Sequence, residues 1–254
     1  MLGGKKYEGA FYAKTDIGSV RISNEDQAKA LINAYGDVIL IVCDGMGGQN
    51  KGDYAAKVAI DHIAECFYKK KGSFHFYTEA RTWLNLVLKE CNDLIYSESE
   101  KNKTYSGMGT TAVVALIFGR RMVIANIGDS RAYSFERYLG LKRLTEDQTY
   151  VDYLIKTGQI KEGESSTHPD RHVLMNALGI FPSLSLTLTN FNYRGEAVLL
   201  CSDGLYNNMS EQEINMVLDT DDRVDQKVLS LISEANANGG SDNIAIAYWE
   251  ALHD

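Results

Sequence analysis

Apolar residues recur along the chain in two periods, and each period predicts a kind of element. Seven stretches alternate between apolar and polar positions or run as short apolar blocks, which is typical of strands covered on one or both faces. These predicted strands are residues 7–16, 37–44, 110–118, 121–129, 183–191, 196–203 and 243–250. The block AVVALIF at 112–118 is among the longest apolar runs, yet it is far shorter than the roughly 20 residues that cross a bilayer. We therefore expect no membrane span.

Helical periodicity appears in two pairs of segments. Residues 52–69 and 78–99 carry apolar positions at helical spacing and lie next to each other in the sequence. Later in the chain, Ser210 and Glu213 form a capping-box pattern that opens one helix, and residues 221–238 form another. Consecutive strands with two helical pairs predict an α+β fold, in which antiparallel sheets carry helices on their outer faces.

The chain shows no boundary between domains. Its 254 residues include only two prolines, Pro169 and Pro182, and no linker rich in glycine and serine. Residues 145–180 hold a short helical pattern around YVDYLIKTG and then mostly polar residues, which indicates a surface insertion. We therefore predict one domain over residues 1–254 with an insertion at about 145–180.

The net charge and the cysteine content argue against several classes of protein. The formal net charge of −8 lacks the Lys/Arg excess that nucleic acid requires, and it suits a protein that holds divalent cations. The N-terminal MLGGKKYEGA has no apolar core of a signal peptide, and the four cysteines form no Cys-x-x-Cys pair. We expect a reduced, cytoplasmic protein without a structural zinc site. The five histidines show no zinc-ligand spacing; His62 falls in a helical pattern, and His168 and His172 fall in the insertion.

Carboxylates follow or precede several predicted strands. ILIVCDGMGG places Asp44 after an apolar run and before three glycines, and EAVLLCSDGL repeats this pattern at Asp203. Asp129 follows another strand in RMVIANIGDSRAY, and Asp242 precedes the last strand. Gathered, partly buried carboxylates repel one another unless they are protonated or hold hard cations such as Mg²⁺ or Mn²⁺. We interpret the aspartates as metal ligands and the glycines as room for a carbonyl or a phosphate.

Plainer interpretations stay open for individual residues. An Asp-Gly pair alone is most often a turn, and Asp16 is equally well explained as a turn residue before Gly18. Glu25 and Asp26 could be a solvated pair. Other phosphate-binding and nucleophile motifs do not fit, because the glycine cluster lacks the Lys-Ser/Thr of a P-loop and the chain has no G-x-S-x-G.

Eight motifs in one order resemble those of the type 2C serine/threonine protein phosphatases, in the bacterial branch of the metal-dependent (PPM) family. The similarity runs from about residue 10 to residue 250. The motifs are TDIGSVRISNEDQ, VCDGMGGQNKGDYAA, GMGTTAVVAL, IANIGDSRAY, LTEDQTYV, HPDRHVLMNALG, LLCSDGL and GGSDNIAIAYW.

This resemblance implies a four-layer α-β-β-α sandwich of two antiparallel sheets flanked by helical pairs, with residues 145–180 as a flap beside the active site. It also implies hydrolysis of phosphoserine and phosphothreonine in proteins by a water activated by two or three Mn²⁺ or Mg²⁺ ions, with Arg21 gripping the substrate phosphate. The resemblance implies that Glu25 and Asp26 act on the metals through bound waters. The implied direct metal ligands are Asp44, the carbonyl of Gly45, Asp129, Asp203 and Asp242.

Several positions depart from the family pattern. Met46 stands where many eukaryotic members carry a histidine proposed as general acid, and Gln148 replaces a histidine common in the flap. MNALG at 175–179 replaces a more usual Thr-Arg-Ala-Leu-Gly, and Ala245 replaces a common threonine. None of these changes removes an implied metal ligand.

The resemblance leaves two alternatives to a general phosphatase, namely a catalytically dead phosphoprotein-binding module and a phosphatase dedicated to one regulatory partner. The expected partners are phosphoprotein substrates, among them a serine/threonine kinase and its targets. We expect a monomer.

Overall fold

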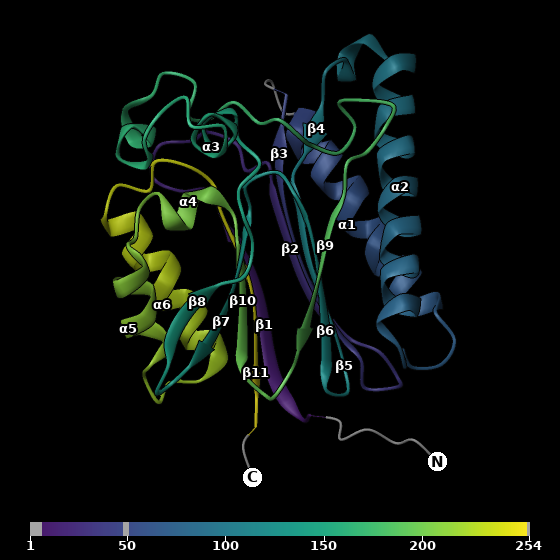
Figure 1. Cartoon of the computed structure of the whole chain (residues 1–254), viewed down its shortest axis with the longest axis vertical. Helices are drawn as coiled ribbons and strands as arrows, with labels where there is room; N and C mark the ends of the chain where they lie inside the picture. Colours follow the sequence, from purple (N-terminus) through teal and green to yellow (C-terminus); the bar gives the residue numbers. More distant parts are fainter. Residues whose placement is uncertain (1–6, 48–50, 253–254) are drawn as a thin grey trace.

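The computed structural model describes residues 7–47 and 51–252 and arranges them as two facing sheets between two helical layers (Figure 1). Every strand pairing within these residues is antiparallel. The first sheet has the order β1 (Gly9–Asp16), β11 (Ile244–Ala251), β10 (Ala197–Cys201), β7 (Arg131–Glu136) and β8 (Gly140–Arg143). The second has the order β2 (Asp26–Ile32), β3 (Val38–Met46), β5 (Ala112–Phe118), β6 (Arg121–Ile127) and β9 (Thr187–Asn192), and β4 (Gly109–Thr110) pairs with β3.

Helices cover the outer face of each sheet. The second sheet carries α1 (Lys51–Lys69) and α2 (Tyr77–Lys101), and the first carries α5 (Glu211–Leu218) and α6 (Val224–Ala237) (Figure 1). The shorter elements are α3 (Tyr150–Lys156), α4 (Asp203–Tyr206) and two 3₁₀ turns, η1 (Lys103–Tyr105) and η2 (Glu162–Thr167). None of the helices in the described part of the chain is long and apolar enough to cross a membrane.

Strand β3 explains the continuous apolar run of the sequence, because both of its faces are covered. Ile39, Ile41 and Cys43 face the cluster that α1 and α2 complete, and Leu40 and Val42 face the other sheet. The layer between the sheets also contains Trp249, whose indole N–H donates to the Tyr193 hydroxyl at 2.7 Å. The apolar faces of both sheets and of the helices are therefore buried against one another.

The predicted architecture of two antiparallel sheets flanked by helical pairs is confirmed. Each of the seven predicted strands overlaps an observed strand, but β2, β7 and β8 were not predicted. Strand β2 (DQAKALI) has only alanines and two terminal aliphatic residues, so its apolar pattern is weak. The predicted strand at 196–203 ends earlier, because Ser202 is the N-cap of α4 and Asp203 is its first residue.

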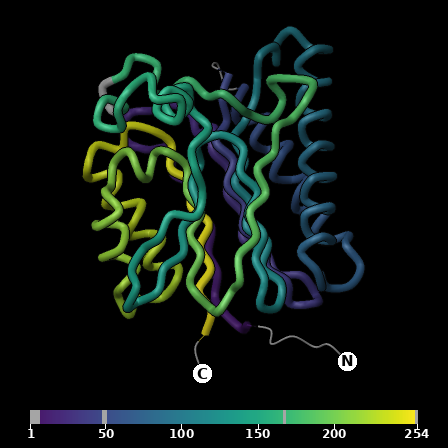
Figure 2. The backbone as a smooth tube through the Cα atoms, viewed as in Figure 1, coloured from purple at the N-terminus to yellow at the C-terminus, as the bar shows by residue number. Residues whose placement is uncertain are grey.

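Residues 145–180 cross the end of both sheets, between β8 and β9 (Figure 2). One end is held at β6, where the Gly128 N–H donates to Gln148 Oε1 at 3.0 Å and Gln148 Nε2 donates to the Asn126 carbonyl at 3.1 Å. The other end is held on α2, where Asn92 Oδ1 accepts from the Gly179 N–H at 2.9 Å. The segment is thus anchored to the second sheet and to its helical layer.

Candidate metal centre

The connections at this end of the sandwich enclose a cavity of about 1160 Å³. Asp44 enters it from β3, and Asp129 from the turn after β6. Asp203 enters at the start of α4, and Asp242 just before β11. Seven of the predicted site residues line this cavity, namely Arg21, Glu25, Asp44, Gly45, Asp129, Asp203 and Asp242. The structure therefore brings together residues that are distant in the sequence, such as Arg21 and Asp242, which are 221 positions apart.

The backbone around Asp44 is fixed on both sides. The Asp44 N–H donates to Thr111 Oγ1 at 3.0 Å, and its carbonyl accepts from the Thr111 N–H at 2.8 Å. Thr110 Oγ1 donates to the same carbonyl at 3.0 Å. A ligand with so constrained a backbone costs little further ordering when it binds an ion.

The glycines after Asp44 and Asp203 each leave room for a backbone carbonyl, which is one of the two roles that the sequence suggests. A Cβ on Gly45 would lie 2.2 Å from the carbonyl oxygen of Gly52, at the start of α1. Likewise, a Cβ on Gly204 would lie 1.9 Å from the Asn243 carbonyl oxygen. At both positions the missing side chain makes room for packed backbone of the protein itself rather than for a ligand.

Buried negative charges dominate the electrostatics of the cavity. Burial, and then the charges of Asp26, Asp203, Asp129 and Asp242, raise the pKa of Asp44 well above its usual range. Burial and neighbouring carboxylates likewise raise the pKa of Asp203 well above the usual value, and that of Asp129 to about 6. Without cations these groups repel one another, and oxygen donors at rigid positions are the ligands that Mg²⁺ and Mn²⁺ prefer. The donor set therefore fits hard divalent cations.

Asp26 is not half of a solvated pair, because it is 1% exposed. It lies opposite Asp44 in the β2–β3 register, and Ser202 Oγ donates to its Oδ2 at 2.6 Å. Burial, partly offset by the Ser202 bond, raises the pKa of Asp26 to about 7. Asp16, by contrast, is a turn residue, since its Oδ1 accepts from the Gly18 N–H at 2.9 Å.

Arg21 faces the carboxylates. One of its terminal nitrogens donates to Asp242 Oδ2 at 2.6 Å, and the Arg21 side chain is 56% exposed. The guanidinium is thus at the cavity mouth and can exchange this partner for a substrate oxygen, because exposed ion pairs are weak.

Sequence reasoning did not single out several cavity residues. Asn243 ties the loop before β2 to β11: its Nδ2 donates to the carbonyls of Ile17 and Ser23, both at 2.9 Å, and its Oδ1 accepts from the Glu25 N–H, also at 2.9 Å. From residues 145–180, Arg171 and His172 also line the cavity. The Asp-Asn motif and the basic residues of HPDRH were visible in the sequence, but the pattern did not indicate what they contact.

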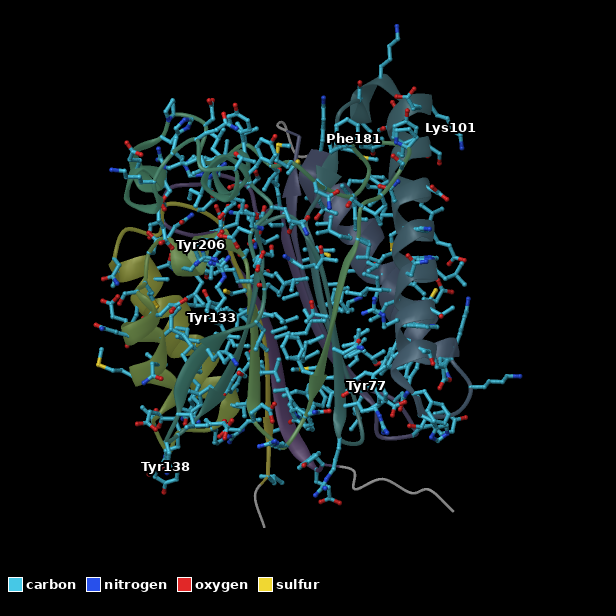
Figure 3. All side chains as sticks on the ribbon, viewed as in Figure 1. Tyr77, Lys101, Tyr133, Tyr138, Phe181 and Tyr206 are labelled. Atoms are coloured by element: carbon cyan, nitrogen blue, oxygen red, sulfur yellow. The ribbon has the colours of Figure 1, made fainter. Side chains whose placement is uncertain are left out.

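A buried charge network supports the backbone of Asp129. The Tyr206 hydroxyl donates to the Asp129 carbonyl at 3.2 Å, and the Arg131 guanidinium carbon lies 3.4 Å from the centre of the Tyr206 ring. Arg131 in turn binds Asp147, with its closest contact at 2.7 Å. Burial lowers the pKa of Arg131, but its bonds to Asp147 outweigh this and raise the pKa above the usual value. Figure 3 shows Tyr206 and Tyr133, a second partner of Arg131, on the side of the sandwich covered by α5 and α6.

Comparisons with known proteins give one consistent result. The family model described as protein phosphatase 2C matches residues 19–238. The serine/threonine phosphatase Stp of Listeria monocytogenes is 35% identical over 238 residues, which cover 93% of this chain and 94% of that protein. The structure of the serine/threonine phosphatase Stp1 from Staphylococcus aureus superposes with a TM-score of 0.89 at 32% identity, covering 100% of this chain and 98% of that one. The catalytic domain of the phosphatase PstP, solved with two manganese ions, gives a TM-score of 0.82 at 30% identity and covers 96% and 99% of the two chains.

Proposed function

The chain belongs to the protein phosphatase 2C family and is a metal-dependent protein serine/threonine phosphatase, and from this premise we propose how its cavity acts. The carboxylate cavity is the catalytic centre, and the phosphate monoester of a phosphoserine or phosphothreonine side chain is hydrolysed there. The observation that carries this proposal is the convergence of Asp44, Asp129, Asp203 and Asp242 on one cavity with raised carboxylate pKa values.

Two or three Mn²⁺ or Mg²⁺ ions are the cofactors. Asp44 and the Gly45 carbonyl would hold the central ions together with Asp203 and Asp242, and Asp129 with Asp203 would hold a third. Glu25 and the buried Asp26 would contact these ions through water. When bound, such ions supply a water of lowered pKa as the nucleophile and neutralise charge on the phosphate.

The protein's own cations orient the substrate. Arg21 would leave Asp242 and donate two hydrogen bonds to the phosphate, for which its planar guanidinium is suited. Arg171 and His172 add basic residues to the cavity lining, so residues 145–180 act as a flap that favours anionic substrates. The Met46 side chain also lines the cavity and has no proton to give, so the leaving oxygen takes its proton from water or from another group.

The biological partners follow from the reaction class. We infer that the substrates include a bacterial serine/threonine kinase and its targets, that residues 1–254 act as one catalytic domain, and that the protein acts as a cytoplasmic monomer. The Listeria and Staphylococcus proteins are serine/threonine phosphatases by name, which supports the substrate class but does not identify the kinase.

A phosphothreonine peptide tests the proposal. We expect turnover with Mn²⁺, none with EDTA, and none in the Asp203→Asn variant. Asp93→Asn is the matched control, because Asp93 is exposed on α2, and it should keep full activity. Mn²⁺ binding by the wild-type protein without turnover would contradict the enzyme and favour a phosphoprotein-binding module.

A further inference from the structure

The helical pair α1–α2 carries a second group of metal-ligating side chains, far along the helices from the carboxylate cavity. His62 and Cys66 lie one turn apart on α1, and Glu90 faces them from α2. Among the described residues, these three are the one group of three or more His, Cys, Asp or Glu side chains whose ligand atoms all lie within 4.8 Å of one another. None of them lines the catalytic cavity.

Two of the three separations are close to those around a tetrahedral ion, and all three ligand atoms lie within 4.8 Å of one another. His62 Nε2 lies 3.1 Å from Glu90 Oε2 and 3.6 Å from Cys66 Sγ. A tetrahedral zinc ion, with bonds of about 2.0–2.2 Å to nitrogen or oxygen and about 2.3 Å to sulfur, separates N from O by roughly 3.3 Å and N from S by roughly 3.6 Å. The same imidazole nitrogen contacts both other ligands.

The surroundings also favour an ion. Cys66 packs against the edge of the apolar cluster beneath α1 and α2, and the negative charges of Glu90 and Glu65 act at its position. The nearby cation Lys69 is paired with Glu65 on the same helix. A Cys66 thiolate and a Glu90 carboxylate carry two negative charges, which one divalent cation neutralises.

We propose that His62, Cys66 and Glu90 bind a borderline-soft divalent cation of the Zn²⁺ class, distinct from the hard ions of the catalytic centre. The nitrogen and sulfur ligands select this class, whereas Mg²⁺ and Mn²⁺ prefer oxygen. On binding, the thiol proton of Cys66 leaves to solvent, the His62 imidazole binds through Nε2 with its proton on Nδ1, and water completes the coordination. The ion links α1 to α2 in place of the direct contact between His62 and Glu90.

The proposal runs against the prediction of no zinc site, and the reason is topological. Zinc sites are recognised in sequence by closely spaced pairs of Cys or His, whereas here the third ligand lies 24 positions beyond Cys66, on another helix. The sequence shows His62 and Cys66 at an i, i+4 spacing, which alone is common on helices. Only the packing of α1 on α2 brings Glu90 to them.

Cobalt titration of the full-length protein tests the proposal. The protein is stripped with EDTA and returned to excess Mg²⁺, which occupies the oxygen ligands of the catalytic centre. Co²⁺ should then produce a thiolate-to-cobalt charge-transfer band in the near ultraviolet, and Cys66→Ser should lose it. Glu65→Gln is the matched control on the same helical turn and should keep the band.

Zinc binding gives an independent readout. Loss of a residue that only hydrogen-bonds a metal ligand weakens metal binding roughly 10–100-fold. Cys66→Ser and His62→Gln remove ligands themselves, so each should weaken Zn²⁺ binding at least about 100-fold. Zn²⁺ should raise the melting temperature of the wild type and not of either variant, each protein being compared with its own metal-free melting temperature. A cobalt band that persists in Cys66→Ser, a band absent from the wild type, or equal stabilisation of all three proteins by Zn²⁺ would overturn the proposal.

Discussion

Replacing Asp147 by asparagine measures how much a buried charge contributes to the support of the cavity. The Asp147 side chain is 9% exposed and binds both Arg131, which is 18% exposed, and Arg143. Asparagine keeps the shape but loses the charge, and it turns an amide group toward two guanidinium groups. Removing one partner of a buried ion pair costs about 3–5 kcal/mol. Because both arginines retain some contact with water, we expect about 3 kcal/mol.

Urea denaturation followed by circular dichroism, in EDTA at neutral pH, is the assay. In a thermal melt followed by the same signal, a loss of about 3 kcal/mol should lower the melting temperature by roughly 6–12 °C in a chain of this length. Asp221→Asn is the control, because Asp221 also pairs with an arginine, Arg137, but is 91% exposed, and its denaturation midpoint should not change.

A double variant separates the pair from the individual residues. If Arg131 and Asp147 are coupled, Arg131→Met with Asp147→Leu should lose less free energy of unfolding than the sum of the two single changes. A loss below about 1 kcal/mol in Asp147→Asn would place the pair in the class of surface ion pairs and refute the reasoning. Strict additivity in the double variant would refute it as well.

Three further predictions concern the cavity. Gly45→Ala places a Cβ against the backbone of α1, so we expect a loss of at least about 1–3 kcal/mol in urea denaturation, and an unchanged midpoint would contradict the packing. In EDTA, the free energy of unfolding should fall as the pH rises from about 4 to about 7. Folded Asp26 (pKa about 7) and Asp129 (pKa about 6) retain protons that the unfolded chain releases near the ordinary aspartate pKa of 3.8. Saturating Mn²⁺ should remove this fall, and a free energy that rises with pH in EDTA would be the contrary result. Gln148→Ala removes the side-chain oxygen that accepts hydrogen bonds from the Gly128 N–H and, at 2.7 Å, from Asn176 Nδ2. We expect the loss of kcat on a phosphopeptide, expressed as a free energy, to exceed the loss in the free energy of unfolding. A kcat equal to that of the wild type would show that residues 145–180 keep their position without Gln148.

The sequence predicted the layers of the fold well because its strongest elements are covered on both faces. Strands such as β3 and β5 are continuous apolar runs, and α1 and α2 have long amphipathic patterns, so their period is unambiguous. Strand β2 was missed because its place in the sheet depends on pairing with β3 rather than on its own residues. Tertiary context, not propensity, decides such a strand.

The candidate site was predictable as a set of residues but not as a set of contacts. Aspartates beside glycines at strand ends were visible in the sequence, and the family resemblance assigned each an expected role. The sequence could not show that Asp26 is buried opposite Asp44, or that the space beside Gly45 is filled by α1. Both facts depend on residues that meet only when β2, β3 and α1 pack together.

The two groups of metal ligands differ both in the type of donor atom and in the secondary structure that carries them. Oxygen donors lie at strand ends, where backbone bonds such as those of Asp44 to Thr111 hold them rigidly. The nitrogen and sulfur donors His62 and Cys66 lie in mid-helix, on a helix that begins against Gly45. Mg²⁺ and Mn²⁺ bind weakly to nitrogen and sulfur donors, and Zn²⁺ binds a site with a thiolate more tightly than a site of carboxylates alone. The protein would therefore load both kinds of ion at once, and zinc bound between α1 and α2 would stiffen the helix that packs behind the catalytic aspartate without displacing the catalytic ions.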